Sequence, residues 1–328
     1  MRDELARYNN IMGLRQEITI GSRGSKLALT QTNWVKAQLE RLNPHRKFSV
    51  EIIHTRGDKI TDVALFRIGG KGLFTKELEV ALLEGKIDLA VHSLKDLPTE
   101  LPPNLALGAI PEREDPHDLL IGEGLRGLRQ LPAGARVGTS SLRRRAQIMA
   151  MRPDIEVVDL RGNLDTRLKK LKTLGLNAII VARAGVNRLG VSQDSAHAIP
   201  YEEMLPAVGQ GALAIEIRRG DKAIEAVVSP MDHVPTHQAV EAERALMLEL
   251  QGGCQVPIGA IAHVKESTMK LEAVICSLDG KRIIRDSGSG PVTRAREIGI
   301  GLAQRLLKSG GREILEEIRQ MTPTENPA

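Results

Sequence analysis

Cys254 is the first residue in this sequence whose type and setting indicate chemistry. Gly252 and Gly253 precede it and can adopt positive φ, and Pro257 stiffens the chain that follows. Cysteine is mostly a buried residue, so a cysteine on a glycine-rich loop is displayed in an unusual way. Taken alone, a Gly-Gly-Cys sequence is more often a loop thiol without a role. Its interpretation therefore depends on the other candidate residues.

Arginines recur at the points where expected strands end. Four such junctions carry cations, at residues 21–25, 138–145, 161–167 and 182–188. In open α/β sheets, ligands collect at the carboxyl ends of strands, where helix N-termini present free N–H groups. The planar guanidinium group binds carboxylates through two parallel hydrogen bonds. One such junction is usually a solvated helix start, but four on the same edge of the sheets predict a ligand with several negative charges.

A fifth junction, residues 92–98, carries a carboxylate as well as a cation. Asp96 follows Lys95 and precedes Leu97-Pro98. A carboxylate among cations stays ionised, and it can stabilise a developing positive charge or accept a ring N–H. An aspartate in a turn before proline is the structural alternative, and the spacing leaves both interpretations open.

Other familiar site patterns are incomplete. Residues 69–72 lack the spacing of a Walker loop, and residues 209–214 lack the last glycine of a dinucleotide fingerprint. His233 and His237 have a metal-like spacing without companion ligands, so we expect no metal site.

The composition limits the protein class. The chain has 328 residues, 41% hydrophobic and 27% charged, with a net charge of +5, which predicts a soluble protein of two or three domains. Three Phe, two Tyr and one Trp do not interleave with the arginines, which argues against a nucleic-acid partner. No apolar run reaches about 18 residues, and residues 1–16 lack a signal-peptide core, so we expect a cytoplasmic protein without membrane contact. Two cysteines provide no disulfide framework.

The candidate residues lie between strands and helices that alternate. The first block has expected strands at 17–20, 50–54 and 87–91, and the second has strands ending at 137, 160 and 182. Prolines punctuate residues 98–116, a plausible crossing between domains, and a smaller α+β pattern begins at residue 236. This alternation predicts an α/β fold with largely parallel sheets covered on both faces.

Several long motifs now resemble one family, the porphobilinogen deaminases or hydroxymethylbilane synthases. They run in that family's order from about residue 17 to the end of the chain. The motifs are Thr55-Arg-Gly-Asp58, Gly69-Gly-Lys-Gly-Leu-Phe74, Lys76-Glu-Leu-Glu79, Val91-His-Ser-Leu-Lys-Asp-Leu-Pro98, Arg113-Glu-Asp-Pro116, Val137-Gly-Thr-Ser-Ser-Leu-Arg-Arg144, Leu160-Arg-Gly-Asn163, Thr166-Arg167, Ala207-Val-Gly-Gln-Gly-Ala212, Ala242-Glu-Arg-Ala245 and Gly252-Gly-Cys-Gln-Val-Pro257.

The resemblance implies a reaction and a cofactor. Such enzymes are transferases of tetrapyrrole biosynthesis, the route to porphyrins and heme. They deaminate four porphobilinogen molecules and join them head to tail into hydroxymethylbilane. A dipyrromethane cofactor, bound to Cys254 through a thioether, would prime the chain. Each pyrrole carries an acetate and a propionate, which agrees with the many arginines, and a thiolate is a suitable nucleophile for the first methylene carbon.

The resemblance also implies roles for individual residues. Asp96 would be catalytic, holding pyrrole N–H groups and stabilising the charge that develops as ammonia leaves. The implied cofactor-binding residues are Cys254, Asp96, Lys95, Ser141, Arg143, Arg144 and Arg167. The implied substrate-binding residues are Arg23, Ser25, Arg161 and Arg188. Lys71 and Phe74 would lie on a loop that moves over the site.

The implied fold has two domains like those of periplasmic binding proteins, with a cleft between them, and a small C-terminal α+β domain that presents the cysteine. The expected boundaries are an extension at 1–16, a first domain at 17–112 and 212–230, a second at 113–211 and a third at 231–328. We expect a monomer. The chain departs from the family pattern at Arg67, where lysine is common, and at Arg183, where a small apolar residue is common. We interpret Arg183 as facing solvent.

Two other classes share part of this pattern. A non-catalytic protein that binds a polyanion would have the arginines but would need neither Asp96 nor Cys254. A nucleic-acid protein would bind any duplex with a steep dependence on salt.

Overall fold

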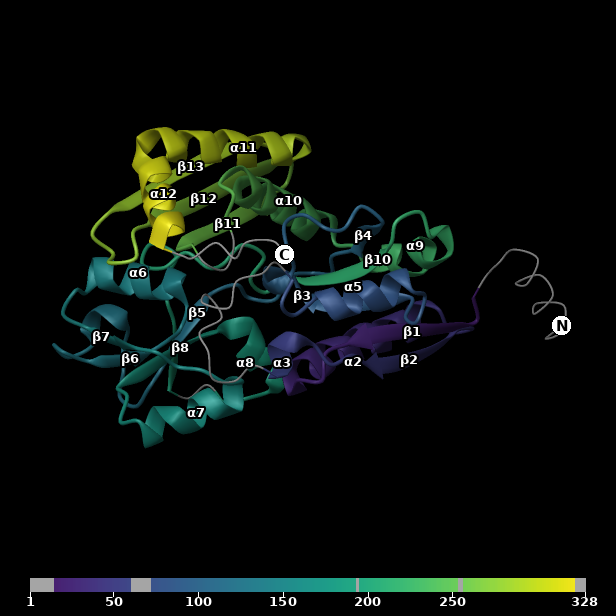
Figure 1. Ribbon diagram of the computed structural model, residues 1–328, viewed down its shortest axis with the longest axis horizontal. Helices are drawn as coiled ribbons and strands as arrows, with labels where there is room; N and C mark the ends of the chain where they lie inside the picture. The colour runs from purple at the N-terminus through teal and green to yellow at the C-terminus, as the bar shows by residue number, and fades with distance from the viewer. Residues whose placement is uncertain (1–14, 60–71, 193–194, 253–255, 322–328) are drawn as a thin grey trace, which may run out of the picture. The chain divides into compact units, whose positions relative to one another are not determined.

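The computed structural model describes residues 15–59, 72–192, 195–252 and 256–321 (Figure 1). Two residues with predicted roles, Lys71 and Cys254, lie outside the described residues, as does Arg67. The chain forms two compact units whose borders fall after residues 113, 211 and 237. The first unit contains one sheet, and the second contains two.

The sheet of the first unit is mixed, with one reversed strand. Its order is β2-β1-β3-β10-β4, in which β1 pairs in parallel with β2 and β3, and β10 runs antiparallel to β3 and β4. The strands are β1 (Glu17–Ser22), β2 (Lys47–Ile52), β3 (Leu89–Ser93), β4 (Leu105–Ala109) and β10 (Leu213–Arg218).

Helices cover both faces of this sheet. Side chains of α2 (Lys26–Leu42) and α9 (Lys222–Val228) share one hydrophobic core with it. Side chains of α5 (Lys76–Leu83) share another with Ile87, Ala90 and Leu105. A short helix, α3 (Arg56–Lys59), follows β2.

The first sheet of the second unit repeats this arrangement. Its order is β7-β6-β8-β5-β9, and β5 is the reversed strand. The strands are β5 (Asp118–Ile121), β6 (Arg136–Gly138), β7 (Glu156–Val158), β8 (Ala178–Ala182) and β9 (Ala196–Ala198). The helices are α6 (Leu142–Met151) on one face, and α7 (Leu164–Thr173) and α8 (Arg183–Leu189) on the other. The predicted α/β class with largely parallel sheets is confirmed.

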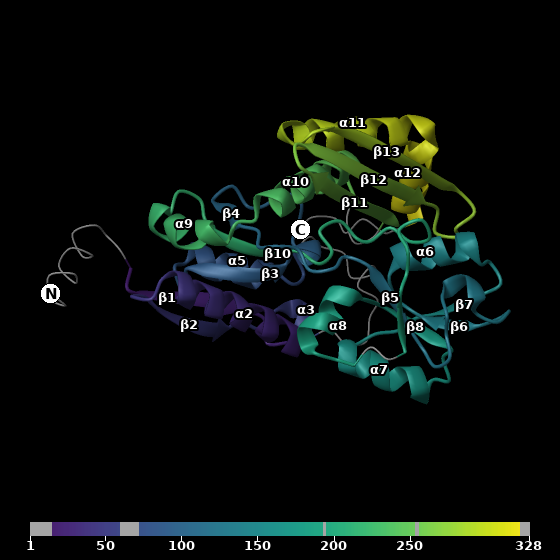
Figure 2. The same ribbon diagram turned by 180° about the vertical axis from the view of Figure 1, so that it is seen from behind.

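The C-terminal part is α+β, as expected. Its sheet is an antiparallel meander of β11 (Ile258–Lys265), β12 (Thr268–Cys276) and β13 (Ile283–Pro291). Side chains of α10 (Val234–Glu249), α11 (Ala295–Leu306) and α12 (Arg312–Met321) form one core with this sheet. Figures 1 and 2 show α11 running along the sheet in both views. The exact domain boundaries remain a prediction.

Capping residues fix the helix starts that follow three of the strands. The side chain of Ser25 accepts a hydrogen bond from the third residue of α2 at 3.3 Å, and Ser141 does the same for α6 at 3.4 Å. Asn163 caps α7 at 2.9 Å. Gly162 precedes this cap with a φ of +107°, and a Cβ there would lie 2.6 Å from the Thr166 side chain. These caps place helix N-termini at the carboxyl ends of the strands.

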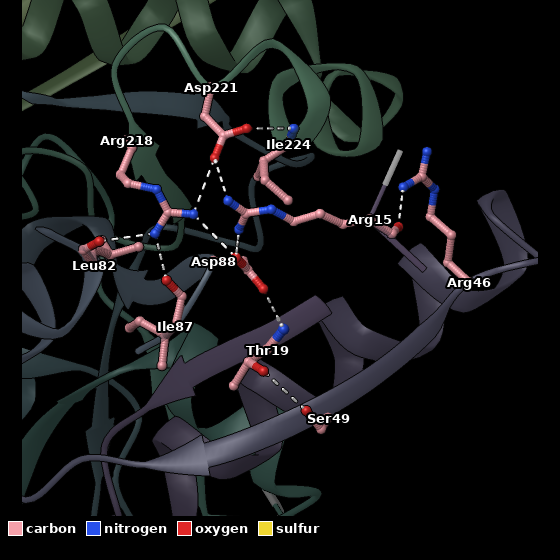
Figure 3. Close-up of polar contacts among 10 residues, drawn as sticks. All are labelled: Arg15, Thr19, Arg46, Ser49, Leu82, Ile87, Asp88, Arg218, Asp221 and Ile224. Carbon is pink, nitrogen blue, oxygen red and sulfur yellow. Dashed lines mark hydrogen bonds and ion pairs between the residues drawn. The ribbon is translucent and has the colours of Figure 1, made fainter. Parts of the chain in front are cut away.

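An ion network lies at the amino ends of β1 and β3, at the end of the first sheet away from Asp96 (Figure 3). Arg218, the last residue of β10, donates to two main-chain carbonyls and also pairs with Asp88 at 3.1 Å and Asp221 at 3.0 Å. Arg15 pairs with the same Asp88. Asp88 precedes β3 whereas Asp96 follows it, so this network stabilises the edge remote from the predicted site. Arg15, which we assigned to an N-terminal extension, is therefore bound to the folded unit.

Candidate functional site

A pocket of the first unit brings four predicted site residues together. It is lined by Arg23, Ser25, Phe74 and Asp96, with His92 among the other residues. Arg23 follows β1, Ser25 caps α2, and Asp96 ends a 3-10 turn (Leu94–Asp96) that follows β3. Three of these residues thus lie at the carboxyl edge of the sheet, where the arrangement of the motifs predicts them.

The turn that carries Asp96 is held on both sides. The Leu94 amide donates to the Ala212 carbonyl at 3.0 Å. Ser93 and the buried Gln31 of α2 exchange hydrogen bonds at 2.9 and 3.1 Å. The end of β3 is therefore fixed to its neighbours, and the position of Asp96 is fixed with it. Lys95 lies in the same turn.

Arg23 is oriented by an anion and by an aromatic ring. Its guanidinium pairs with Asp58 at 2.5 Å and lies 4.1 Å from the centroid of the Phe74 ring. Burial alone would raise the pKa of Asp58, but hydrogen bonds from Arg23 and Thr55, together with the charge of Arg23, lower it below its ordinary value. The cation in the pocket is held in place by a partner that stays ionised.

In the second unit, two predicted cofactor residues bind a carboxylate of the protein itself. Arg143 and Arg144 each approach the buried Asp118 at 2.7 Å. Burial would raise the pKa of Asp118, but the charges and hydrogen bonds of both arginines hold it well below its ordinary value. Arg143 also donates to the Leu205 carbonyl at 2.7 Å, and burial lowers its own pKa. Sequence reasoning missed Asp118, whose only signal is a charge directly before the short apolar run of β5.

Arg167 and Arg144 form a cluster with surplus positive charge. Arg167 donates through Nε to the Gly162 carbonyl at 2.8 Å, and within the described ranges it has no carboxylate partner. Burial and the charge of Arg144 lower the pKa of Arg167 to about 10. The buried Nε of Arg144 has no hydrogen-bond partner among the described residues. Ser141 caps α6, the helix that carries Arg144. This arrangement is suited to an anionic ligand.

The remaining arginines differ in their surroundings. Arg188 donates to the Gly211 carbonyl at 2.7 Å. Burial lowers the pKa of Arg188, and the negative charge of Glu114 raises it by a smaller amount. Arg161 is half-buried in the loop that follows β7. Arg183 does not simply face solvent, because it pairs with Asp115 at 2.9 Å and its Nε is buried.

Neither a metal centre nor a membrane helix is found in the part of the chain that the structure describes. No group of three or more His, Cys, Asp or Glu side chains there has the arrangement of a metal site. His233 contacts Thr236 at 2.8 Å, and His237 contacts Asp232 at 2.8 Å. None of the described helices is long and apolar enough to cross a membrane.

Comparison with family models covers most of the chain. The model described as "Porphobilinogen deaminase, dipyromethane cofactor binding domain" matches residues 18–226, and that of the "Porphobilinogen deaminase, C-terminal domain" matches residues 237–308. The chain belongs to the porphobilinogen deaminase family. The resemblance that the motifs indicated is thereby confirmed.

Curated relatives agree with this assignment over nearly their whole length. The porphobilinogen deaminase of Desulforamulus reducens is 51% identical over 306 residues, which cover 93% of this chain and 99% of that protein. The protein of the same name from Moorella thermoacetica is 52% identical over 303 residues, covering 92% and 97%.

Some solved structures resemble the chain remotely. A probable amino-acid transporter extracellular-binding protein of Bacillus subtilis has a TM-score of 0.41 at 14% identity, over 66% of this chain and 90% of that one. A likeness at this level carries no argument about activity.

Proposed function

We propose that this chain deaminates four porphobilinogen molecules and joins them head to tail into hydroxymethylbilane, releasing four ammonia molecules. Membership of the family supports the reaction class. The observation that carries the proposal furthest is the pocket in which Asp96 lies with Arg23, Ser25 and Phe74.

The pocket has the groups that a pyrrole with two acidic side chains requires. Arg23 and the Ser25 hydroxyl offer donors for acetate and propionate oxygens. Asp96, on a turn fixed by Ser93 and Leu94, offers an anionic acceptor for a ring N–H. The same charge favours the positive charge that develops in the ring as the carbon–nitrogen bond breaks. Arg161 and Arg188 belong to this proposal as further substrate contacts.

The residues of the second unit fit a carboxylate-bearing cofactor. Arg143 and Arg144 share the single charge of Asp118, and Arg167 has no carboxylate partner among the described residues, so this group keeps the surplus positive charge that a resident polyanion would require. When bound, dipyrromethane would supply the free pyrrole carbon to which the first substrate is joined. We propose that Arg144, Arg167 and Ser141 hold its carboxylates and that Cys254 anchors it through a thioether, with Lys95 as a further contact. Arg143 contributes by fixing Asp118, the anion that orients Arg144.

Intact mass tests the cofactor part of the proposal. The purified chain should exceed its sequence mass by two pyrrole units and should react with an acidic aldehyde reagent for pyrroles. Cys254→Ser should give largely unmodified protein. A Cys254→Ser variant that carries the full added mass would contradict the anchor, and a wild-type chain of bare sequence mass would contradict the cofactor.

Turnover tests the catalytic part. Asp96→Asn should keep the fold and the added mass but slow turnover by roughly 10²–10⁴, the range of a group engaged in proton transfer or charge stabilisation. Turnover within a few-fold of wild type would exclude Asp96 from this role.

We also propose that the protein is a monomer and works in the cytoplasm. Light scattering coupled to size exclusion should give the mass of one chain, and fractionation of the host cell should recover activity without membranes. A dimer mass, or activity bound to the membrane fraction, would overturn the respective statement.

A further inference from the structure

A buried histidine–carboxylate pair lies behind the pocket of the first unit. The Nε2 atom of His92 is 2.8 Å from Oε2 of Glu216, and their side chains are 3% and 0% exposed. His92 belongs to β3 and Glu216 to β10. In the register of these strands Ala214 is opposite His92 and Ala90 is opposite Glu216, so the pair lies diagonally on one face of the sheet.

A second carboxylate joins this pair from the helix that covers the same face. Glu79 lies on α5, whose apolar side chains pack on Ala90 and Leu105, and it is 9% exposed. Figure 1 shows α5 beside β3 and β10. Three titratable side chains from three elements thus lie within the core of the first unit.

The cluster is not fully satisfied by hydrogen bonds. Oε1 of Glu216 is buried and has no partner in the described part of the chain. Buried polar atoms almost always have a partner, because an unpaired one loses the hydrogen bonds it makes to water. Replacing a buried ion pair with apolar side chains is often neutral or stabilising, so stability alone does not account for this cluster.

The cluster reaches the pocket through two side chains. His92 and Thr75 both line the pocket that contains Asp96. His92 contacts Glu216, and the Thr75 hydroxyl donates to Oε1 of Glu79 at 2.8 Å. Each buried carboxylate is thus one side chain away from the pocket.

Burial and neighbouring carboxylates favour the protonated form of Glu79. Burial raises the pKa of Glu79; the hydrogen bond from Thr75 and the charge of His92 oppose this, while the charges of Glu216 and Glu77 raise it further. A carboxyl group with a raised pKa exchanges protons nearer to neutral pH than an exposed one does. Among the described residues, Glu77 of α5 is a further charge that acts on Glu79, and Asp96 and Arg23 line the pocket that His92 also lines.

The proposed reaction needs a proton acceptor in addition to a stabilising charge. In each addition the carbon–nitrogen bond of the substrate breaks, and the electron pair leaves with ammonia. A bond then forms between the freed carbon and a pyrrole α-carbon, which must lose its proton to restore the aromatic ring. The proton balance closes when that proton is passed to ammonia, which leaves as ammonium. Without a second group, Asp96 would have to stabilise the positive charge as ammonia leaves and then also accept this proton.

We propose that His92, backed by Glu216 and Glu79, is a second proton-exchanging group of the pocket and takes up the proton that the pyrrole carbon loses. Glu216 and Glu79 are positioning residues that stabilise the imidazolium form. This inference rests on the proposed function.

The test compares His92→Gln and Glu79→Gln with a matched control, His237→Gln. The control removes another histidine–carboxylate contact of the first unit, that with Asp232, away from the pocket. Turnover is measured between about pH 5 and 9 on protein whose cofactor load has been verified by mass. His92→Gln should lower kcat by roughly 100-fold with KM within about three-fold, and should remove one ionisation from the pH profile of kcat. Glu79→Gln should keep most of kcat and shift that ionisation. His237→Gln should match wild type.

A second readout does not depend on turnover. The ring resonances of the histidines are titrated by NMR, and the His92 signal is identified by its loss in His92→Gln. Glu216→Gln and Glu79→Gln should shift the titration of this signal and leave that of His237 in place. A His92→Gln variant with kcat within three-fold of wild type and an unchanged pH profile would overturn the inference. If that variant fails to fold, an unchanged profile in Glu79→Gln overturns it. A wild-type chain without activity would instead refute the proposed function.

Discussion

Asp118→Asn should strongly destabilise the second unit while changing almost no volume. The carboxylate makes two charge-assisted hydrogen bonds of 2.7 Å, one to Arg143 and one to Arg144. Bonds of this kind are each worth about 1.5–3 kcal/mol. Removing the charge also leaves two buried guanidinium groups without a counterion, and breaking a buried pair in this way costs about 3–5 kcal/mol. The bond from Gln210 at 2.8 Å can persist, because an amide oxygen also accepts. We therefore expect a loss of about 3–5 kcal/mol.

The assay is urea unfolding followed by circular dichroism, with Asp154→Asn as the matched control. Asp154 pairs with Arg152 at 2.6 Å on the surface, and surface pairs contribute little. The control should therefore have nearly the wild-type midpoint. A midpoint for Asp118→Asn that equals that of the control would refute the reasoning.

The pH dependence gives an independent check of the same charge. The pKa of Asp118 is held below its ordinary value of 3.8, so its stabilisation is present above about pH 4. As the pH falls below the unfolded value towards the folded one, the unfolded chain binds a proton first and the stabilisation is lost. The difference between wild type and Asp118→Asn should be constant near neutrality and should shrink in acid. A difference that does not change with acidity would show that shape, not charge, accounts for the effect.

Three further outcomes are expected. Arg167→Gln removes surplus positive charge beside Arg144, so the chain without cofactor should be at least as stable as wild type. The variant should nevertheless carry less cofactor, and an intact mass that shows full loading would contradict this. Arg218→Gln should lower the unfolding free energy of the first unit by about 2–4 kcal/mol, since Arg218 joins two main-chain carbonyls to Asp88; an unchanged urea midpoint would exclude that contribution. Asp58→Asn should release Arg23 and raise KM for porphobilinogen several-fold with a smaller effect on kcat, and the reverse pattern would argue against a binding role for Arg23.

Most helices and strands were predictable because their periodicity is strong, but the seven-residue helices α8 and α9 were not. The residues of β5, β9 and β13 were not recognised as strands. β5 has four residues and begins with a charged side chain, and β9 is Ala196-His197-Ala198, which contains no large apolar side chain. β13 contains Arg285-Asp-Ser-Gly-Ser-Gly290, whose composition is typical of loops. It is a strand because β12 provides a full antiparallel register along its length.

The sequence predicts which residues line the site, but not which carboxylates pair with its arginines. Spacing predicted Arg23, Ser25 and Asp96 at one edge of the sheet, and the three residues line one pocket. Spacing could not show that Asp58 holds Arg23 or that Asp118 holds Arg143 and Arg144, because these partners are separated by 35 residues and by 25 and 26 residues. Such pairings depend on tertiary packing, which the local sequence does not encode. Cys254 lies outside the described residues, so its role remains a prediction.

The reversed strand in the first sheet has a consequence for biosynthesis. β10 separates β3 from β4 and is hydrogen-bonded to both, yet its residues follow β3 by roughly 120 positions. At typical ribosomal speeds of about 5–20 residues per second, this interval lasts roughly 6–24 s. During this time the nascent β3 and β4 lack their shared neighbour, so their backbone edges remain open. A pause in translation between residues 110 and 212 would prolong this exposure and should increase the fraction of newly made chains captured by chaperones.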